Sequence, residues 1–268
     1  MIVNYPRMRR RVAEPTASVT PTAGVTYING LSGLEAPKVS LFAQAISNNS
    51  GITNETTTVY VDFGSVHRRI RVGDQVTLPL DGTNYAFDVI GFNHDTLTTP
   101  TAYGAATATG KAGITFQMHD LFGTNFAMNN SETTEGGWTF SKMRTSTMVT
   151  MKGYLPSDWQ AAIKTVKKVS SIGGESSSIP ETVDDDCFLL AEVEIFGEVL
   201  NSVEGEGVQY AYYKAGNSKA KYQNDAAIDW WERSPASGDE YDFCLVLYED
   251  AGINSADATN GVAFGFCA

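Results

Sequence analysis

From Val59 onward the chain is a succession of short segments rich in β-branched and aromatic residues, separated by Gly- and Asp-containing turns. Segments this short fit strands better than helices, which usually need ten residues or more. The Asp81-Gly82 pair between two such segments predicts a β-hairpin, because both residues accept the left-handed backbone of a tight turn. We therefore expect a strand-rich α+β domain with one or two helices over residues 59–268.

Three later segments carry further expectations. SDWQAAIKTVKKV (157–169) predicts the best helix, since Ser157 is a natural N-cap and the apolar residues recur on one face. The Ser- and Gly-rich residues 170–186 predict a flexible connector. CFLLAEVEIFG (187–197) predicts a buried strand.

Residues 1–58 differ from the rest because Thr, Ala, Ser, Asn, Gly and Pro dominate them. Only PKVSLFAQAIS (37–47) has the apolar content of a short helix or strand. We predict an extended N-terminal arm that a partner orders, and not a domain that folds alone.

Charge is distributed unevenly along the chain. The net charge is −12, but residues 1–72 carry eight Lys/Arg against four Asp/Glu. The acidic remainder argues against nucleic acid and anionic membranes as partners, and the absence of a long apolar run argues against membrane insertion. A short basic cluster near the N-terminus is typical of a solvated tail or docking peptide; it comprises Arg7, Arg9, Arg10 and Arg11.

The three cysteines, Cys187, Cys244 and Cys267, are too widely spaced for a zinc motif. Cys244 and Cys267 each follow a Phe in an apolar run, which indicates burial. They could pair or stay reduced, and we favour reduced thiols for a protein made in a cytoplasm.

Several phrases occur in a recognisable order: the segment from Val72 to Asp95, GGWTFSKMR (136–144), LPSDWQAAI, FLLAEVEIFG (188–197), WWERSP (230–235) and the terminal GVAFGFC. Together they resemble, over roughly residues 60–268, a family of phages, prophages and gut bacteria: a domain of unknown function with a C-type-lectin-like fold. The C-terminal layout is also similar to that of the variable receptor-binding proteins of diversity-generating retroelements. The resemblance implies a C-type-lectin-like ligand-binding domain at 59–268.

In those proteins a fixed scaffold displays variable residues that bind a bacterial surface receptor. The resemblance implies a comparable face between the anchors Trp230 and Phe264. Tyr offers large contact area at low entropic cost, and Asn, Ser and Asp offer adaptable hydrogen bonds. The predicted ligand-binding residues are Asp239, Tyr241, Asp242, Leu245, Leu247, Tyr248, Asp250, Ile253, Asn254, Ser255, Asp257 and Thr259.

The resemblance implies a phage virion protein, made in the host cytoplasm, that attaches the particle to its host. Residues 1–58 would then serve as a virion-attachment and oligomerisation segment, holding the protein to other virion proteins as a homotrimer similar to a tail fibre. The expected partner is a bacterial surface protein or glycan. The alternative is a capsid decoration or head-fibre structural protein with the same domain.

Two further features have a structural and a functional interpretation. The adjacent Trp230 and Trp231 suit either the core or a sugar-stacking platform, and we favour the core for at least one. Arg233 suits an ion pair with Glu192 or Glu194 better than anion recognition, since a planar guanidinium matches a carboxylate held inside a fold. Arg144 is interpreted in the same way.

Metal binding and catalysis have weak support. His94-Asp95 and His119-Asp120 could converge on a metal, but loop caps explain them more simply. Residues 181–206 hold nine acids and no Lys or Arg, yet lack a DxDxDG calcium loop, so we expect a solvated acidic face. Hydrolase, metalloprotease and nucleotide-binding motifs are likewise missing from the sequence. We therefore predict no enzyme activity, no cofactor and no metal.

Overall fold

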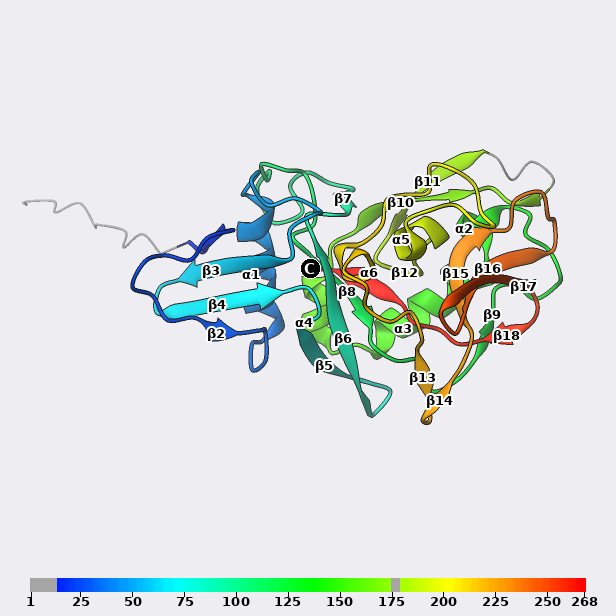
Figure 1. Cartoon of the computed structure of the whole chain (residues 1–268), viewed down its shortest axis with the longest axis horizontal. Helices are drawn as coiled ribbons and strands as arrows, with labels where there is room; N and C mark the ends of the chain where they lie inside the picture. The colour runs from blue at the N-terminus through cyan, green and yellow to red at the C-terminus, as the bar shows by residue number, and fades with distance from the viewer. Residues whose placement is uncertain (1–13, 175–178) are drawn as a thin grey trace, which may run out of the picture.

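The computed structural model describes residues 14–174 and 179–268 and shows an elongated, strand-rich α+β molecule (Figure 1). Its largest sheet has five antiparallel strands in the order β12-β19-β8-β6-β5. The C-terminal strand β19 lies inside this sheet, between β12 and β8. The bounds are β5 (Gln75–Leu80), β6 (Thr83–Phe92), β8 (Ile114–Met118), β12 (Cys187–Phe188) and β19 (Gly265–Cys267).

The predicted hairpin at Asp81-Gly82 is confirmed. It joins β5 to β6, and the two turn residues have φ values of 47° and 80°. Positive φ at both positions is what a two-residue hairpin turn requires, and the flanking strands pair without a register shift.

The domain core is built around aromatic rings of the central sheet. Phe116 stacks on Phe266 with ring centroids 5.3 Å apart, and Trp159 meets both rings edge-on. Phe87 joins them through Phe266 at 5.4 Å. Each of these rings is buried, and burial stabilises the fold by about 2 kcal/mol per large apolar side chain.

Residues 14–58 are not an extended arm in this structure. They contain the helix α1 (Ala36–Ser47) and two strands, β1 (Thr16–Ser18) and β2 (Ile28–Asn29). The two strands belong to a four-stranded sheet of order β1-β3-β4-β2. Its other strands are β3 (Thr58–Phe63) and β4 (Val66–Arg71), so the predicted boundary at residue 58 cuts a paired sheet. The basic cluster at residues 7–11 lies outside the described residues.

The buried face of α1 explains why these residues fold against the domain. Val39, Phe42 and Ile46 are fully buried within the main core cluster. The amide of the buried Asn93 donates to the carbonyls of Ile46 and Ile52, at 3.0 and 2.8 Å. The composition of residues 1–58 concealed this helix among polar loops, and the expectation of an extended arm was therefore wrong for residues 14–58.

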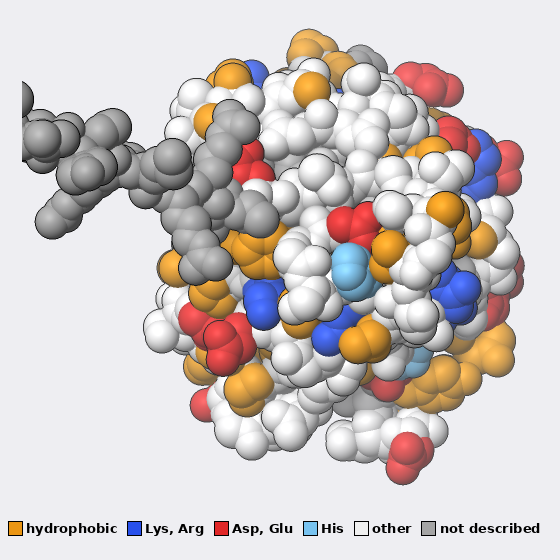
Figure 2. Space-filling model, turned by 90° about the vertical axis from the view of Figure 1, so that its left-hand side faces the viewer, with side chains coloured by type: hydrophobic (Ala, Val, Ile, Leu, Met, Phe, Trp, Pro, Cys, Tyr) orange, Lys and Arg blue, Asp and Glu red, His pale blue; other side chains and the backbone are white. Residues whose placement is uncertain are grey.

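Figure 2 views the molecule from the end that carries this N-terminal sheet. Basic, acidic and apolar side chains are interspersed there, and the basic ones do not gather into one patch. Arg71, for example, pairs with Asp74 at 3.2 Å.

The remaining strands form smaller antiparallel units. Two three-stranded sheets have the orders β11-β10-β7 and β15-β16-β17, and two strand pairs are β13-β14 and β18-β9. Their bounds are β7 (Thr96–Leu97), β9 (Phe126–Ala127), β10 (Val166–Ser171), β11 (Pro180–Asp185), β13 (Tyr222–Gln223), β14 (Ala226–Ala227), β15 (Trp230–Pro235), β16 (Asp242–Leu247), β17 (Asp250–Ser255) and β18 (Thr259–Asn260).

The helices that follow α1 are short. They are α2 (Gly137–Phe140), the π-helical turn η1 (Met143–Met148), α3 (Val149–Tyr154), α4 (Ser157–Ala162), α5 (Glu192–Phe196) and α6 (Ala211–Lys214). In the described residues, none is long and apolar enough to cross a membrane.

The helix predicted over 157–169 ends at Ala162, and its N-cap is Pro156 rather than Ser157. The following VKKVSS segment is strand β10, where Val166 and Lys168 are buried and Lys167 is exposed. That alternation has the period of a strand, and pairing with β11 overrides the local helical preference.

The connector predicted at 170–186 is wrong at both of its ends. Residues 170–171 are the end of β10, and residues 180–185 form β11, which pairs with β10 along its whole length. Residues 175–178 lie outside the described residues.

The strand predicted at 187–197 is limited to β12. A helical turn, α5, follows because the Glu194 carboxylate accepts the N–H of Ala191 at 3.0 Å, as in a capping box. Gly197, at φ 81°, then ends the helix.

Candidate binding face at the C-terminal hairpin

The predicted ligand-binding residues lie on and around the hairpin of β16 and β17, at the end of the molecule opposite the N-terminal sheet (Figure 1). β16 is the central strand of its sheet and β17 is an edge strand. The two strands pair in register from Asp242–Ser255 to Leu247–Asp250.

The register divides the predicted residues between the two faces of the hairpin. Leu245 and Leu247 share a face with Gly252, while Ile253 lies on the opposite face, paired with Cys244. A Cβ at position 252 would collide with the side chain of Leu247, so only a glycine leaves room for that side chain. The predicted residues therefore do not form a single flat face.

Exposure separates the predicted residues further. Leu245 is buried at 1% exposure and belongs to the core, so its assignment as a ligand contact was wrong. Asp239, Asp242, Asn254 and Ser255 are half-buried. The exposed residues are Tyr241, Leu247, Tyr248, Asp250, Ile253, Asp257 and Thr259.

Tyr248 stands at the tip of the hairpin with an unusual backbone. It is 57% exposed and has φ 59°, in the left-handed region that favours Gly and Asn. An L-residue pays roughly 1–2 kcal/mol for this conformation. The left-handed φ suits the two-residue turn that joins β16 to β17, and this turn directs the aromatic side chain to solvent.

The next residue, Glu249, fixes the turn that presents Tyr248. Its carboxylate accepts hydrogen bonds from the Ser218 hydroxyl at 2.5 Å and from the backbone N–H of Lys219 at 3.0 Å. Partial burial alone would raise the pKa of Glu249, but these donors hold the pKa below its usual value. The ionised carboxylate of Glu249 therefore holds the hairpin tip against the loop at 218–220.

Tyr241 is presented by a second fixed turn. The Asp239 carboxylate accepts the backbone N–H groups of Tyr241 and Asp242, at 2.7 and 3.0 Å. A hydrogen bond with the Glu240 carboxylate raises the pKa of the Tyr241 hydroxyl. Both exposed tyrosines thus project from turns whose backbones are already ordered, which lowers the entropic cost of binding.

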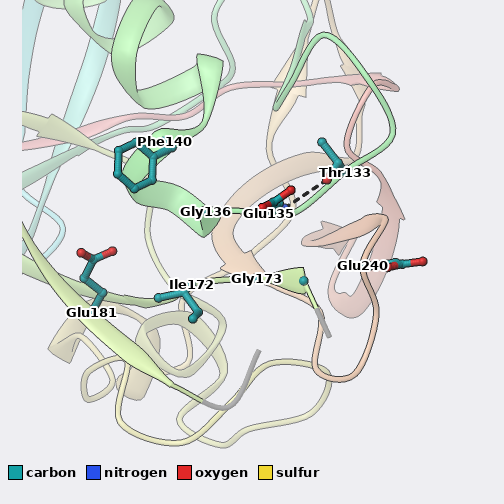
Figure 3. A pocket seen from close by; sticks show the side chains of 9 residues that line it. Thr133, Glu135, Gly136, Phe140, Ile172, Gly173, Glu181 and Glu240 are labelled. Atoms are coloured by element: carbon teal, nitrogen blue, oxygen red, sulfur yellow. Dashed lines mark hydrogen bonds between the residues drawn. The ribbon is translucent and has the colours of Figure 1, made fainter. Parts of the chain in front are cut away.

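An open groove of about 950 Å³ is lined on one side by Glu240, the residue before Tyr241 (Figure 3). Among the described residues, three glutamates and no Lys or Arg line it, and Phe140 contributes an aromatic ring that is 72% exposed. The groove residues are Thr133, Glu135, Gly136, Phe140, Ile172, Gly173, Gly174, Glu181 and Glu240. Sequence reasoning missed it because its walls come from three distant parts of the chain: residues 133–140, the region from 172 to 181, and Glu240.

Thr134 joins the groove to the hairpin. Its N–H donates to the carbonyl of Glu240 at 2.8 Å, and its hydroxyl donates to the carbonyl of Asp239 at 3.1 Å. The N–H of Gly174 in turn donates to the Thr134 hydroxyl at 2.9 Å. The groove and the Asp239 turn are therefore one connected surface.

A buried ionic network lies beneath this region and includes Arg233. The Arg233 guanidinium bonds the Glu194 carboxylate, which confirms one of the two expected partners, whereas Glu192 is not the partner. Lys168 bridges Glu194 to Asp95 at 2.8 Å each. Burial alone would raise the pKa of Asp95, but the Lys168 ammonium holds the pKa well below its usual value.

Trp230 and Trp231 are both fully buried, so neither is available as a sugar-stacking platform. Their indole N–H groups donate to the carbonyls of Lys219 and Phe126, at 2.9 and 2.7 Å. The interpretation of Arg144 as an ion-pair residue is confirmed, because its Nε lies 2.6 Å from an oxygen of Asp185.

The two histidines have separate environments. His94 stacks on Tyr210 with ring centroids 3.7 Å apart, while His119 pairs with Asp88 at 2.8 Å. Neither belongs to a group of potential metal ligands in the described part of the chain. Cys187, Cys244 and Cys267 are free thiols, all buried.

The expectation of a solvated acidic face at 181–206 was wrong for four of its residues. Asp185, Glu192, Glu194 and Glu206 are buried at 0–4% exposure. No local pattern indicated this burial, because the partners come from α2, η1, β10, β15 and the loop at 200–202.

A family model described as a domain of unknown function (DUF6273) matches residues 114–265. This range contains the central strand β8, the buried ionic residues after it and the whole β16–β17 hairpin. Neither the curated proteins nor the solved structures contain a match. Since the matched range spans more than half of the 268 residues, the chain belongs to the DUF6273 family.

Proposed function

We propose that this chain is a phage receptor-binding protein that attaches the virion to a bacterial surface ligand and catalyses no reaction. The ligand contacts are the exposed residues of the β16–β17 hairpin together with the acidic groove. The observation that carries the proposal is Tyr248, an exposed tyrosine held in a left-handed turn by the Glu249 clamp.

Four exposed side chains give the hairpin the composition of a binding surface. Tyr241, Leu247, Tyr248 and Ile253 are 41–57% exposed within one hairpin and its flanking turn. Aromatic side chains on ordered turns are enriched at recognition surfaces because little entropy is lost on binding. The three groove glutamates favour a ligand with a cationic part.

The arrangement of the molecule supports attachment at one end and recognition at the other. The N-terminal sheet and the hairpin lie at opposite ends of the long axis (Figure 1). The N-terminal sheet of β1, β3, β4 and β2 would join other virion proteins, and the strands that follow it would form a C-type-lectin-like domain pointing outward. As a homotrimer, weakly binding copies would gain avidity of about 10²–10⁴.

A capsid decoration or head-fibre role is the second candidate. It also requires one end that attaches to the virion and one end that points outward, but it requires no particular receptor. Labelled antibody against the chain distinguishes the two on intact particles. Label at the tail supports receptor binding, and label distributed over the capsid supports decoration.

The direct experiment titrates the purified full chain onto intact cells of gut bacteria, with heat-unfolded protein as the control. We expect saturable binding to a subset of strains. Binding to no strain, together with capsid label, would contradict the receptor-binding proposal.

A further inference from the structure

A closed cluster of acidic and thiol side chains lies beneath the hairpin. Carboxylate oxygens of Glu192 and Glu232 and the sulfur of Cys244 all lie within 4.8 Å of one another, and all three residues are buried. They come from α5, β15 and β16, which no local sequence motif would bring together.

Glu232 is the unexplained member of this cluster. It is 0% exposed, and neither of its carboxylate oxygens has a hydrogen-bond partner in the described structure. Protonation would remove its charge but leave its new O–H without an acceptor, and an unsatisfied buried group still costs about 1–3 kcal/mol. A buried carboxylate therefore calls for a cation close to both oxygens.

The protein cations nearby are committed elsewhere. The neighbouring Arg233 donates to Glu194 and to the backbone carbonyls of Val169, Leu189 and Glu206. The register of β15 on β16 shifts between Trp231 and Pro235, so Glu232 lies within a bulge. Bulges commonly redirect a side chain toward a functional position.

Hydrogen bonds hold the Glu192 carboxylate in one orientation. Backbone N–H groups of Leu200, Asn201 and Ser202 donate to its carboxylate at 2.8–2.9 Å. The Ser202 hydroxyl adds a further bond at 2.8 Å. Such outer hydrogen bonds fix the orientation of coordinating carboxylates.

We propose that Glu192, Glu232 and Cys244 form a structural site for one divalent transition metal, of which zinc fits the donor set best. Zinc accepts thiolate sulfur together with carboxylate oxygen, and at a site with three protein ligands a fourth, non-protein ligand completes the tetrahedron. The ion would neutralise the buried carboxylates and link α5 to the sheet that carries the binding hairpin. Its role is independent of which ligand the hairpin binds.

Binding would require Glu232 and Cys244 to lose their protons. Zinc affinity should therefore fall as the pH is lowered, with release of protons on binding. Because the cluster is closed, we expect the ion to enter during folding.

The test refolds the full chain from denaturant with either EDTA or Zn²⁺ and compares metal content and melting temperature. We expect about one zinc per chain and a higher melting temperature in the zinc sample, as for a structural site. Glu232→Gln should lower zinc affinity at least ~100-fold, beyond the loss typical of outer residues. It should also abolish the zinc-dependent rise in melting temperature.

Co²⁺ provides a readout that stability does not affect. The cobalt-loaded protein should show thiolate-to-cobalt absorption that is lost in Cys244→Ser and kept in Cys187→Ser, whose thiol is also buried but lies outside the cluster. Absence of zinc from the wild-type chain, with equal melting temperatures after both refolding conditions, would overturn the proposal and leave Glu232 as a neutral buried acid. This comparison uses only the wild-type chain, so it does not depend on whether a variant folds.

Discussion

The substitution Lys168→Met should strongly destabilise the fold. The Lys168 ammonium is 1% exposed and lies 2.8 Å from both Asp95 and Glu194, whose side chains are each 3% exposed. Methionine keeps the length of the side chain but removes the charge, which leaves Asp95 buried without its cation. Breaking a buried ion pair in this way costs about 3–5 kcal/mol.

For a chain of this size, each kcal/mol lowers the melting temperature by about 2–4 °C, so the expected loss is roughly 6–20 °C. The matched control is Lys167→Met. Lys167 precedes Lys168 on the same strand but is exposed, so its substitution should change stability by less than about 0.5 kcal/mol. Thermal and denaturant unfolding of the two variants at pH 7 give the comparison.

The pH dependence of the same variant provides a second check. In the wild type the pKa of Asp95 is held well below its usual value, so its stabilising effect is present at neutral pH and is lost as the pH falls through that low pKa. In Lys168→Met, burial without the cation should instead raise the pKa, so Asp95 is stabilised by protonation at acid pH. The stability difference from wild type should therefore shrink between pH 7 and about pH 4. Equal melting of the Lys168 and Lys167 variants at pH 7 would refute this reasoning.

Three further perturbations follow from single contacts. Gly113→Ala should destabilise the fold by about 1–3 kcal/mol, because the new Cβ would collide with the Ala43 carbonyl; unchanged urea unfolding would contradict this. The Asp88 hydrogen bond raises the pKa of His119. The stability that protonated His119 adds to the fold is therefore present below about pH 6.5 and is lost as the pH rises through the raised pKa. In His119→Gln, this part of the pH profile of the unfolding free energy should flatten. Glu249→Ala should release the hairpin tip and speed amide hydrogen exchange there while the central sheet keeps its protection.

The sequence predicted those structural features that depend mainly on residues close together in the chain. The hairpin at Asp81-Gly82 follows from turn chemistry that two residues contain. The pairing of Arg233 with Glu194 was one of two options that charge and burial allowed. Strand alternation predicted core placement for at least one of Trp230 and Trp231, and both are buried.

Long-range pairing accounts for what the sequence did not reveal. Lys168 looked like a late helical lysine, yet it is buried because Asp95 and Glu194 approach it from distant segments. The polar residues 180–185 became a strand because β10 offered an unpaired edge. The acidic groove and the Glu192–Glu232–Cys244 cluster likewise exist only after folding.

The most direct test of the binding face compares two double variants of the full chain. Tyr241→Ala with Tyr248→Ala removes the two exposed tyrosines of the hairpin, and Tyr154→Ala with Tyr222→Ala removes two that are 37% and 43% exposed elsewhere. The measurement is the dissociation constant for intact cells of a strain that the wild-type protein binds. Loss of two aromatic contacts of about 2 kcal/mol each predicts at least a 100-fold weaker constant for the hairpin variant and an unchanged constant for the control. Equal constants for the two variants would contradict recognition through the hairpin.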